Sequence, residues 1–440
     1  MKIPEYAAAA VKQLKKNGFE AYFAGGCVRD CIMNIPPHDF DITTNALPEQ
    51  IKAVFSGYTV IPTGEKHGTV TVIIDGEQLE ITTYRIDSKY TDNRHPDKVE
   101  FSSSLAEDLK RRDFTVNAMA MDVNGNITDL FGGREDLENG IIRAVGKAEE
   151  RFNEDALRIM RALRFAARFG FEIEPETAAA IHECRSLLRN ISAERVRDEF
   201  TGLLCGSHPD SILRSYRDVI AVFIPEIVPC FEFEQHSPYH KYDVWEHTIH
   251  AVNSCRNKEK IRIAMFFHDI AKPDCFKQDE NGRGHFKGHA LKSAGKTEEI
   301  MKRMKFSNRM TEDVVTLISH HSDELNNRYE LRRIIGEIGA ENVFDLLDVQ
   351  RADSLSKQEF CRERLKKSDG QEKEVREIIE NHECVCIKDL EINGYDLMEI
   401  GFSGKEIKTV LKRLLDNVMK DNIKNNRCEL INCAKSLTSK

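Results

Sequence analysis

Two short stretches, AGGCVRD at residues 24–30 and HDFDIT at residues 38–43, decide the fold class of this chain. The first follows an apolar strand pattern. Its paired glycines let the backbone approach a phosphate, and the helix that follows supplies N–H donors. In the second, Asp39 and Asp41 stand at alternate positions entering a strand, so both side chains point to the same face. Such carboxylates repel each other unless a cation offsets them, and Mg²⁺ binds them together with substrate phosphates. The pair therefore predicts metal-assisted chemistry on a nucleoside triphosphate.

The periodicity around these stretches predicts an α/β head followed by an all-helical body. Residues 5–16 have a helical pattern, and 21–24 and 40–43 have strand patterns. Residues 69–74 and 79–84 are predicted to pair antiparallel across Asp75-Gly76. From about residue 153 onward helical patterns take over, interrupted by prolines at 225–238 and by a charged, exposed connector at 366–374. We expect four parts: a head (1–145), a helical neck that binds nucleotide and RNA (146–230), a third domain (236–360) and a C-terminal tail (370–440).

Composition narrows the class of protein. With 40% hydrophobic and 31% charged residues, the chain is an ordinary folded protein. No apolar run approaches the roughly 20 residues of a membrane span and nothing resembles a signal peptide, so we expect a cytoplasmic protein. The net charge of −9 excludes a uniformly basic surface, yet residues 401–440 carry nine Lys or Arg against four acids. Because local patches bind phosphate backbones, this end is either an RNA-binding surface or a solvated helix face.

Two arginine-rich segments follow the aspartate pair. Arg111-Arg112-Asp113 suits a triphosphate clamp in which Asp113 orients one guanidinium. Residues 154–164 have helical composition, and an acid and three arginines recur there at every third position, predicting one side of a helix: Asp155, Arg158, Arg161 and Arg164. An acceptor beside donors matches cytosine and adenine, whereas uracil and guanine present a carbonyl to the carboxylate. The spacing thus predicts selection of C and A without a template.

Together these motifs resemble class II tRNA nucleotidyltransferases (CCA-adding enzymes) of the tRNA nucleotidyltransferase and poly(A) polymerase family. Asp129–Gly133 is similar to the family's hinge motif and Ser192–Arg197 to its neck-helix motif. The resemblance implies a polymerase-β-like head with a small mixed or antiparallel sheet and helices, and Asp39 and Asp41 as catalytic ligands of Mg²⁺. It also implies a set of residues that contact the incoming nucleotide: Gly26, Arg29, Arg112, Asp155, Arg158, Arg161 and Arg164. A third catalytic carboxylate is usual in this superfamily, and the sequence leaves Glu80 and Asp113 as alternatives.

The resemblance extends to substrate and partner. It implies template-independent addition of CCA to the 3′ end of tRNA from CTP and ATP. Residues 390–418 are similar to the tail that holds the tRNA elbow, and residues 85–105 resemble a flexible loop that CC-only members lack. Addition of A alone, or poly(A) synthesis, is the alternative function.

A second set of chemistry-bearing residues lies between positions 236 and 353. Histidines and carboxylates in this order suit a divalent metal and phosphoester hydrolysis. The set resembles the HD phosphohydrolase superfamily, whose minimal motif is matched by four residues: His247, His268, Asp269 and Asp353. His289, His320 and His321 match the extra ligands of two-metal members. We expect a divalent metal of unknown identity here and, as a hypothesis, phosphohydrolase activity on RNA 3′ ends.

Overall fold

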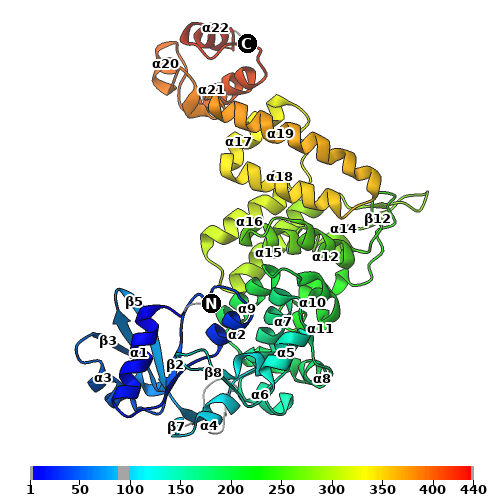
Figure 1. Ribbon diagram of the computed structural model, residues 1–440. Helices are drawn as coiled ribbons and strands as arrows, with labels where there is room; N and C mark the ends of the chain where they lie inside the picture. Colours follow the sequence, from blue (N-terminus) through cyan, green and yellow to red (C-terminus); the bar gives the residue numbers. More distant parts are fainter. Residues whose placement is uncertain (1–2, 88–98, 438–440) are drawn as a thin grey trace. The chain divides into compact units, whose positions relative to one another are not determined.

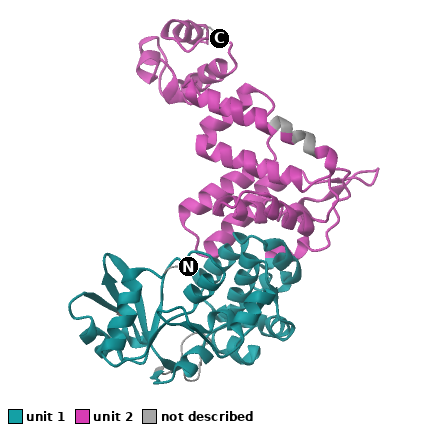
Figure 2. Ribbon diagram, viewed as in Figure 1, with its two compact units in different colours: residues 1–225 teal, residues 226–440 magenta. Residues whose placement is uncertain are grey.

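The computed structural model describes residues 3–87 and 99–437, and the chain divides into two compact units, residues 1–225 and 226–440 (Figure 2). The expected four-part division is finer than this and stays a prediction. The loop expected at residues 85–105 lies largely outside the described residues. No helix in the described ranges is both long and apolar enough to cross a membrane.

A seven-stranded mixed sheet forms the core of the first unit (Figure 1). Its strands, in spatial order, are β3 (Thr59–Gly64), β4 (Thr69–Ile74), β5 (Glu77–Thr83), β2 (Ile42–Thr44), β1 (Ala21–Ala24), β8 (Met119–Met121) and β9 (Ile127–Asp129). The β2–β5 pair is parallel and the other pairs are antiparallel. The mixed sheet expected for the head is thus confirmed.

Local sequence explains the sheet's hairpin and its helices. Asp75 and Gly76 both have positive φ, 53° and 85°, which suits a tight turn between twisted antiparallel strands, and Ile74 pairs with Glu77 across it. Helices in and beside the head are α1 (Glu5–Lys16), α2 (Gly26–Ile32), α3 (Pro48–Val54), α4 (Leu105–Lys110) and α5 (Gly133–Asn139). Helix α1 buries Ala7, Ala10, Val11 and Leu14, the apolar stripe of its pattern. A small ladder joins β6 (Arg85–Asp87) to β7 (Val99–Phe101).

The helical neck completes the first unit. Its helices are α6 (Ala148–Glu154), α7 (Leu157–Phe169), α8 (Pro175–Cys184), α9 (Ala193–Leu204), α10 (Pro209–Ser215) and α11 (Arg217–Ile220). Two short strands, β10 (Ile141–Ile142) and β11 (Glu172–Ile173), pair in parallel. Helix α7 packs closely against α9 and buries a continuous apolar face, so it holds its arginines at fixed positions.

The second unit is helical apart from the ladder of β12 (Lys277–Gln278) with β13 (Gly284–His285). Its helices are α12 (Val244–Ser254), α13 (Glu259–Phe267), α14 (Lys272–Cys275), α15 (His289–Arg303), α16 (Asn308–His320), α17 (Arg328–Ile338), α18 (Ala340–Leu355), α19 (Glu363–Glu380), α20 (Gly394–Glu399), α21 (Lys405–Met419) and α22 (Arg427–Leu437). The last three helices share a small apolar core that includes Leu397, Leu414 and Leu430.

The connector expected at residues 366–374 is wrong, because this stretch lies inside α19. Its charge suggested a loop. However, Val375 and Ile378 are buried, and Arg376 pairs with Glu372 one turn away at 2.7 Å. Ion pairs at this spacing support a polar helix that is anchored by few apolar residues.

Candidate active site and candidate metal centre

All nine residues predicted for the site of the head and neck line a single pocket of about 580 Å³ in the first unit. They are Gly26, Arg29, Asp39, Asp41, Arg112, Asp155, Arg158, Arg161 and Arg164. Eight arginines and five aspartates line this pocket in all, so its wall carries a positive excess. A wall of this charge suits a polyanion such as a triphosphate.

The glycine loop has a conformation that other residues rarely adopt. Gly25 has φ +82°, and a Cβ there would lie 2.7 Å from Arg112 Nη1. Helix α2 begins at the next residue. Arg29 on α2 is buried, pairs with Asp30 at 2.7 Å and donates to Asn117 Oδ1 at 2.7 Å. The loop is therefore held close to two guanidinium groups.

Asp39 and Asp41 line the pocket just before strand β2 begins. The Ala24 N–H donates to the Asp41 carbonyl at 3.1 Å, so the chain is already extended before β2 begins. Burial, and then the charges of Asp39 and Glu80, raises the pKa of Asp41 to about 6. A half-buried carboxylate crowded by two other acids is a site that a divalent cation would stabilise.

The alternatives for a third carboxylate differ in their surroundings. Glu80 is exposed and directly precedes Ile81, which pairs in parallel with Ile42, so Glu80 lies next to Asp41 in register. Asp113 is buried and accepts hydrogen bonds from Arg161 at 2.6 Å and Asn117 at 3.0 Å. Although burial alone would raise it, these partners lower the pKa of Asp113 to about 2. Asp113 is committed to Arg161, which leaves Glu80 as the acid beside the pair.

The arginine clamp has a different anchor from the expected one. The acid expected to orient one of these guanidinium groups, Asp113, pairs with Arg161. Arg111 and Arg112 instead form ion pairs with the fully buried Asp108, at 2.7 Å and 3.3 Å. The Thr43 hydroxyl donates a hydrogen bond to the same carboxylate at 3.0 Å. The spacing of Asp108 to Arg111 and Arg112, three and four residues on a helix, was a signal for this contact that the sequence interpretation missed.

Asp155 is not on the predicted helix. It follows α6 in an extended conformation (φ −134°, ψ 102°), and α7 begins at Leu157. Its carboxylate accepts from the Leu157 N–H at 3.0 Å and from Arg195 Nη2 at 3.1 Å. Arg158 is buried, and its guanidinium donates to Glu154 at 2.9 Å and to the Arg111 carbonyl at 2.9 Å. Both expected partners line the pocket, but each is held by a different neighbour.

The other two predicted arginines, Arg161 and Arg164, also lie beside an acid on α9. Glu199 on α9 lies 2.5 Å from Arg164 and 3.9 Å from Arg161, so the three arginines do not share Asp155 as expected. The guanidinium carbon of Arg164 lies 4.5 Å from the centre of the Phe165 ring, and that of Arg161 lies 5.3 Å from the same ring centre. Ion-pair partners from distant segments cannot be predicted from local spacing, which is why the contacts of Glu199 and Arg195 were missed.

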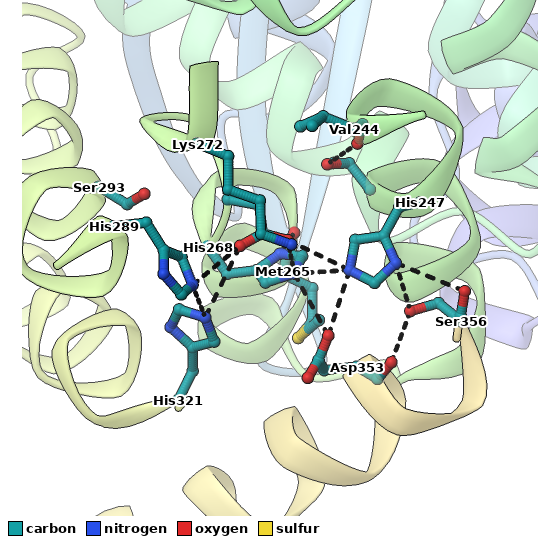
Figure 3. Close-up of polar contacts among 12 residues, drawn as sticks. Val244, His247, Met265, His268, Lys272, His289, Ser293, His321, Asp353 and Ser356 are labelled. Carbon is teal, nitrogen blue, oxygen red and sulfur yellow. Dashed lines mark hydrogen bonds and ion pairs between the residues drawn. The ribbon is translucent and has the colours of Figure 1, made fainter. Parts of the chain in front are cut away.

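In the second unit, histidines and aspartates converge on a second candidate centre (Figure 3). Within the described part of the chain, groups of three or more such ligand atoms within 4.8 Å of one another occur twice. One group contains His247, His268, Asp269 and Asp353, and the other contains Asp269, His289 and His321. Asp269 uses Oδ2 toward His268 (3.1 Å) and Oδ1 toward His289 (3.3 Å), so it lies between the two groups.

The imidazoles are fixed in one orientation. Three of them place Nδ1 against the carbonyl of the residue three positions earlier: His268 with Met265 at 2.7 Å, His289 with Phe286 at 2.8 Å and His321 with Ile318 at 2.7 Å. An Nδ1–H donated in this way leaves the Nε2 lone pair facing the cluster, which is how proteins orient metal-binding histidines. Burial lowers the pKa of His321 to about 3, so its ring is neutral, the form that ligates a metal.

The cluster fits divalent metal ions. His247 Nε2 and His268 Nε2 lie 3.2 Å apart, as do His289 Nε2 and His321 Nε2. Facing lone pairs at this distance are unfavourable without a cation. The buried oxygens of Asp269 have no hydrogen bond of normal geometry among the described residues, although Lys272 Nζ is an ion-pair partner 2.6 Å from Oδ2. The four predicted ligands of the minimal motif are together. His320 is not part of the cluster and pairs with Asp323 at 2.8 Å instead.

Comparisons with known proteins agree with the first pocket. The model of the poly A polymerase head domain matches residues 21–143, and that of the probable RNA and SrmB-binding site of polymerase A matches residues 170–229. A putative tRNA nucleotidyltransferase domain 2 matches residues 289–434. The structure of the Bacillus stearothermophilus CCA-adding enzyme in complex with CTP is 28% identical, with a TM-score of 0.78, and the match covers 100% of this chain and 98% of that chain.

Curated relatives narrow the family. The CCA-adding enzyme of Lactobacillus johnsonii is 51% identical over 52% of this chain, but that match spans only 57% of the relative's own length. The CCA-adding enzyme of Lactobacillus helveticus is 39% identical over 353 residues, which is 78% of this chain and 77% of that protein. With this match across most of both chains, the chain belongs to the family of CCA-adding enzymes.

Proposed function

We propose that this protein adds C, C and A to the 3′ end of tRNA from CTP and ATP, without a template and with Mg²⁺. The observation that carries this proposal is the single pocket in which the acidic pair, the glycine loop and the Asp155–Arg158 segment meet. Several curated relatives and solved structures that the chain resembles are CCA-adding enzymes, one of them in complex with CTP. A cytoplasmic location, as expected from the sequence, is part of the proposal.

In this mechanism Asp39 and Asp41, with Glu80 beside them, would hold Mg²⁺, which would activate the tRNA 3′-hydroxyl and stabilise the departing pyrophosphate. Arg112, which is paired with Asp108, would bind the triphosphate. The missing side chain of Gly25 leaves room for the Arg112 guanidinium. Asp155 would accept a hydrogen bond from the amino group of C or A, and Arg158 would donate a hydrogen bond to the ring nitrogen beside it. Arg195 and Glu154 hold these two side chains in position.

The tRNA would be held by the tail. Its eight described Lys and Arg residues after position 400 are all exposed: Lys405, Lys408, Lys412, Arg413, Lys420, Lys424, Arg427 and Lys435. They surround a small apolar core that is independent of the histidine cluster. Exposed cations on a rigid support suit a folded RNA backbone.

One experiment ranks the possible activities. The protein is incubated with Mg²⁺, labelled CTP or ATP, and tRNAs that end before CCA, after CC or after CCA. Incorporation of both nucleotides that stops at CCA supports the proposal. Incorporation of ATP alone would indicate an A-adding enzyme, and long A tails would indicate a poly(A) polymerase. The Asp41→Ala variant is expected to incorporate nothing.

We also propose that the histidine cluster is an HD-type, metal-dependent phosphohydrolase site acting on 2′,3′-cyclic phosphate or 3′-phosphate at RNA ends. Its supporting observation is the pair of Nε2–Nε2 distances of 3.2 Å around the shared Asp269. Bound divalent ions would supply a nucleophilic hydroxide and polarise the phosphoryl oxygens. RNA ends are the proposed substrate because the head would require a free 3′-hydroxyl.

This second activity is tested with RNAs carrying either phosphate, in the presence of Mn²⁺, Mg²⁺, Co²⁺ or Ni²⁺. The unaltered protein should release phosphate or open the cyclic ester, and His268→Ala should not. The Asp41→Ala variant serves as the matched control, since it should retain this activity. If no metal supports turnover and His268→Ala behaves as the unaltered protein does, the proposal is refuted.

A further inference from the structure

A pocket of about 470 Å³ opens beside the histidine cluster, and two lysines that touch the cluster also line it. Lys272 Nζ lies 2.6 Å from Asp269, and Lys357 Nζ lies 2.5 Å from Asp353. Each carboxylate of the proposed metal site is therefore paired with an ammonium group. Neither lysine has a part in the activities proposed above.

Lys272 is fixed in place by several contacts. Besides Asp269, its ammonium donates to Gln235 Oε1 at 2.8 Å and lies 5.4 Å from the ring centre of Phe286. Its side chain is 5% exposed. Lys272 therefore has two partners besides Asp269 that hold its ammonium in place.

Lys357 is held more loosely. It follows α18, and in the described part of the chain the one carboxylate paired with its ammonium is Asp353. The side chain is 15% exposed and faces the pocket wall. Asp353 turns its other oxygen, Oδ1, toward His247 Nε2 at 3.2 Å. One carboxylate therefore connects the histidine cluster to a lysine at the pocket.

A divalent ion bound at His247, His268 and Asp353 would change this balance. It would draw the electrons of the Asp353 carboxylate and repel the ammonium beside it, since both carry positive charge. The lysine side chain is long and flexible, so Nζ can leave Asp353 without a change of backbone. The pocket is the space open to it, and an anion there would give it a new partner.

We propose that Lys357 binds the phosphate group of the substrate, and that it exchanges Asp353 for a phosphate oxygen when metal binds. This inference rests on the proposed metal-dependent hydrolase and adds the residue that holds the phosphoester. The charge of Lys357 then has two opposite effects. It weakens metal binding, because the ammonium competes for Asp353, and it strengthens phosphate binding once the metal is present.

The test compares Lys357→Met, which keeps the length of the side chain and removes the charge, with the unaltered full-length protein. Calorimetric titration with Mn²⁺ should show tighter metal binding in the variant, by about fivefold. Titration of the Mn²⁺-loaded protein with inorganic phosphate should show weaker binding, by about tenfold. Lys357→Arg should recover most of the phosphate affinity. The matched control is Lys302→Met, which removes the same type of i,i+4 pair, Lys302–Glu298 at 2.5 Å, from the surface of α15 outside the pocket.

The opposite signs separate this role from a structural one. A lysine that only supports the fold would weaken both affinities when removed and lower the thermal midpoint, and that result overturns the inference. Unchanged phosphate binding overturns it as well, while His268→Ala still abolishes Mn²⁺ binding and the proposed hydrolase stands. If the unaltered protein binds no Mn²⁺, the hydrolase and this inference both fail.

Discussion

At the scale of single residues, the pocket of the first unit contains two aspartates with opposite electrostatic roles. Asp113 has its own guanidinium and amide partners, and its pKa falls to about 2. Burial, and then the nearby charges of Asp39 and Glu80, raise the pKa of Asp41 to about 6. The first aspartate stabilises the protein when ionised, whereas the second destabilises it until a cation arrives. Pairs of this kind are typical of active sites.

This contrast predicts opposite effects of two matched substitutions in metal-free protein. Because the pKa of Asp41 is raised in the folded protein, ionisation of this side chain lowers the stability of the fold as pH rises from about 4 to about 6. Asp41→Asn should therefore be more stable than the unaltered protein by about 1–2 kcal/mol at pH 8. The lowered pKa of Asp113 gives stability that is lost as pH falls from about 4 toward 2, so Asp113→Asn should be less stable by about 2 kcal/mol at pH 8. Urea unfolding in EDTA at pH 8 and pH 4 measures both.

The Asp41→Asn advantage should nearly vanish at pH 4, while the Asp113→Asn loss should persist there and shrink only at lower pH. The two substitutions share the same chemistry and the same pocket, so each is the control for the other. Equal changes of the same sign would contradict the assigned environments.

A second prediction at this scale concerns Arg195, which holds Asp155 at 3.1 Å. Arg195→Met should lower kcat/KM for both CTP and ATP by about tenfold, because one charge-assisted hydrogen bond to the carboxylate that we propose reads the base is lost. Discrimination against UTP should fall too, since a free Asp155 can rotate away. Steady-state incorporation assays measure these values. Arg197→Met is the control, because Arg197 pairs with Asp198 and does not line the pocket. Identical kinetics in the two variants would count against the assignment.

At the scale of elements, the junction of β1 with α2 determines whether the pocket exists. Gly25 lies there at φ +82°, with Arg112 Nη1 occupying the space that a side chain would need. The turn between β4 and β5 has a glycine of nearly the same conformation, Gly76 at φ +85°, but with no atom near its missing Cβ. The two positions separate backbone strain from steric exclusion.

We expect Gly25→Ala to lower nucleotide incorporation by at least about 100-fold, because it combines strain with displacement of Arg112. Gly76→Ala should cost about 1 kcal/mol of stability from strain alone and leave incorporation unchanged. Incorporation rates and urea midpoints of the two variants test this. Similar activity in both would show that the contact with Arg112 is unimportant.

The elements also show what can be predicted from the sequence. Helix α1 and strand β1 were predicted with the bounds observed, 5–16 and 21–24, since periodicity and the adjacent glycines mark both ends. The β4–β5 hairpin was predicted through its Asp-Gly turn. The break at Asp155 was not predicted, because the arginine that pairs with this residue, Arg195, lies 40 positions away. The continuity of α19 was not predicted either, because the charge of residues 366–374 hid the two buried residues that anchor the helix, Val375 and Ile378. The members of the candidate sites were largely predicted, whereas the ion pairs that hold them were not.

At the scale of the whole molecule, the two units contain two candidate sites that are built from different ligands. The first would bind Mg²⁺ through carboxylates alone, and the second would bind a divalent metal through imidazoles and aspartates. Each site lies within one unit, between residues 25 and 195 for the first and between 247 and 353 for the second. Metal ions should therefore act on the two units separately.

This separation predicts the response of thermal unfolding to metal. Mn²⁺ at about 100 times its dissociation constant should stabilise the unit with the histidine cluster by about 2.7 kcal/mol and shift its transition upward. Differential scanning calorimetry with and without EDTA measures the shift. His268→Ala should abolish it, and Asp41→Ala should preserve it. A shift that survives in His268→Ala would place the stabilising ion elsewhere.

The extended residue between α6 and α7 has a consequence for how nucleotide preference evolves. Asp155 is aimed by the bend of the main chain and by an arginine 40 positions away. Under the proposed mechanism, a lineage could alter which bases Asp155 accepts by changing the angle between the two helices, with every side chain of the proposed site retained. Comparing catalytic motifs alone would then miss the event, and ancestral reconstruction of this family should track the helix junction as a heritable trait.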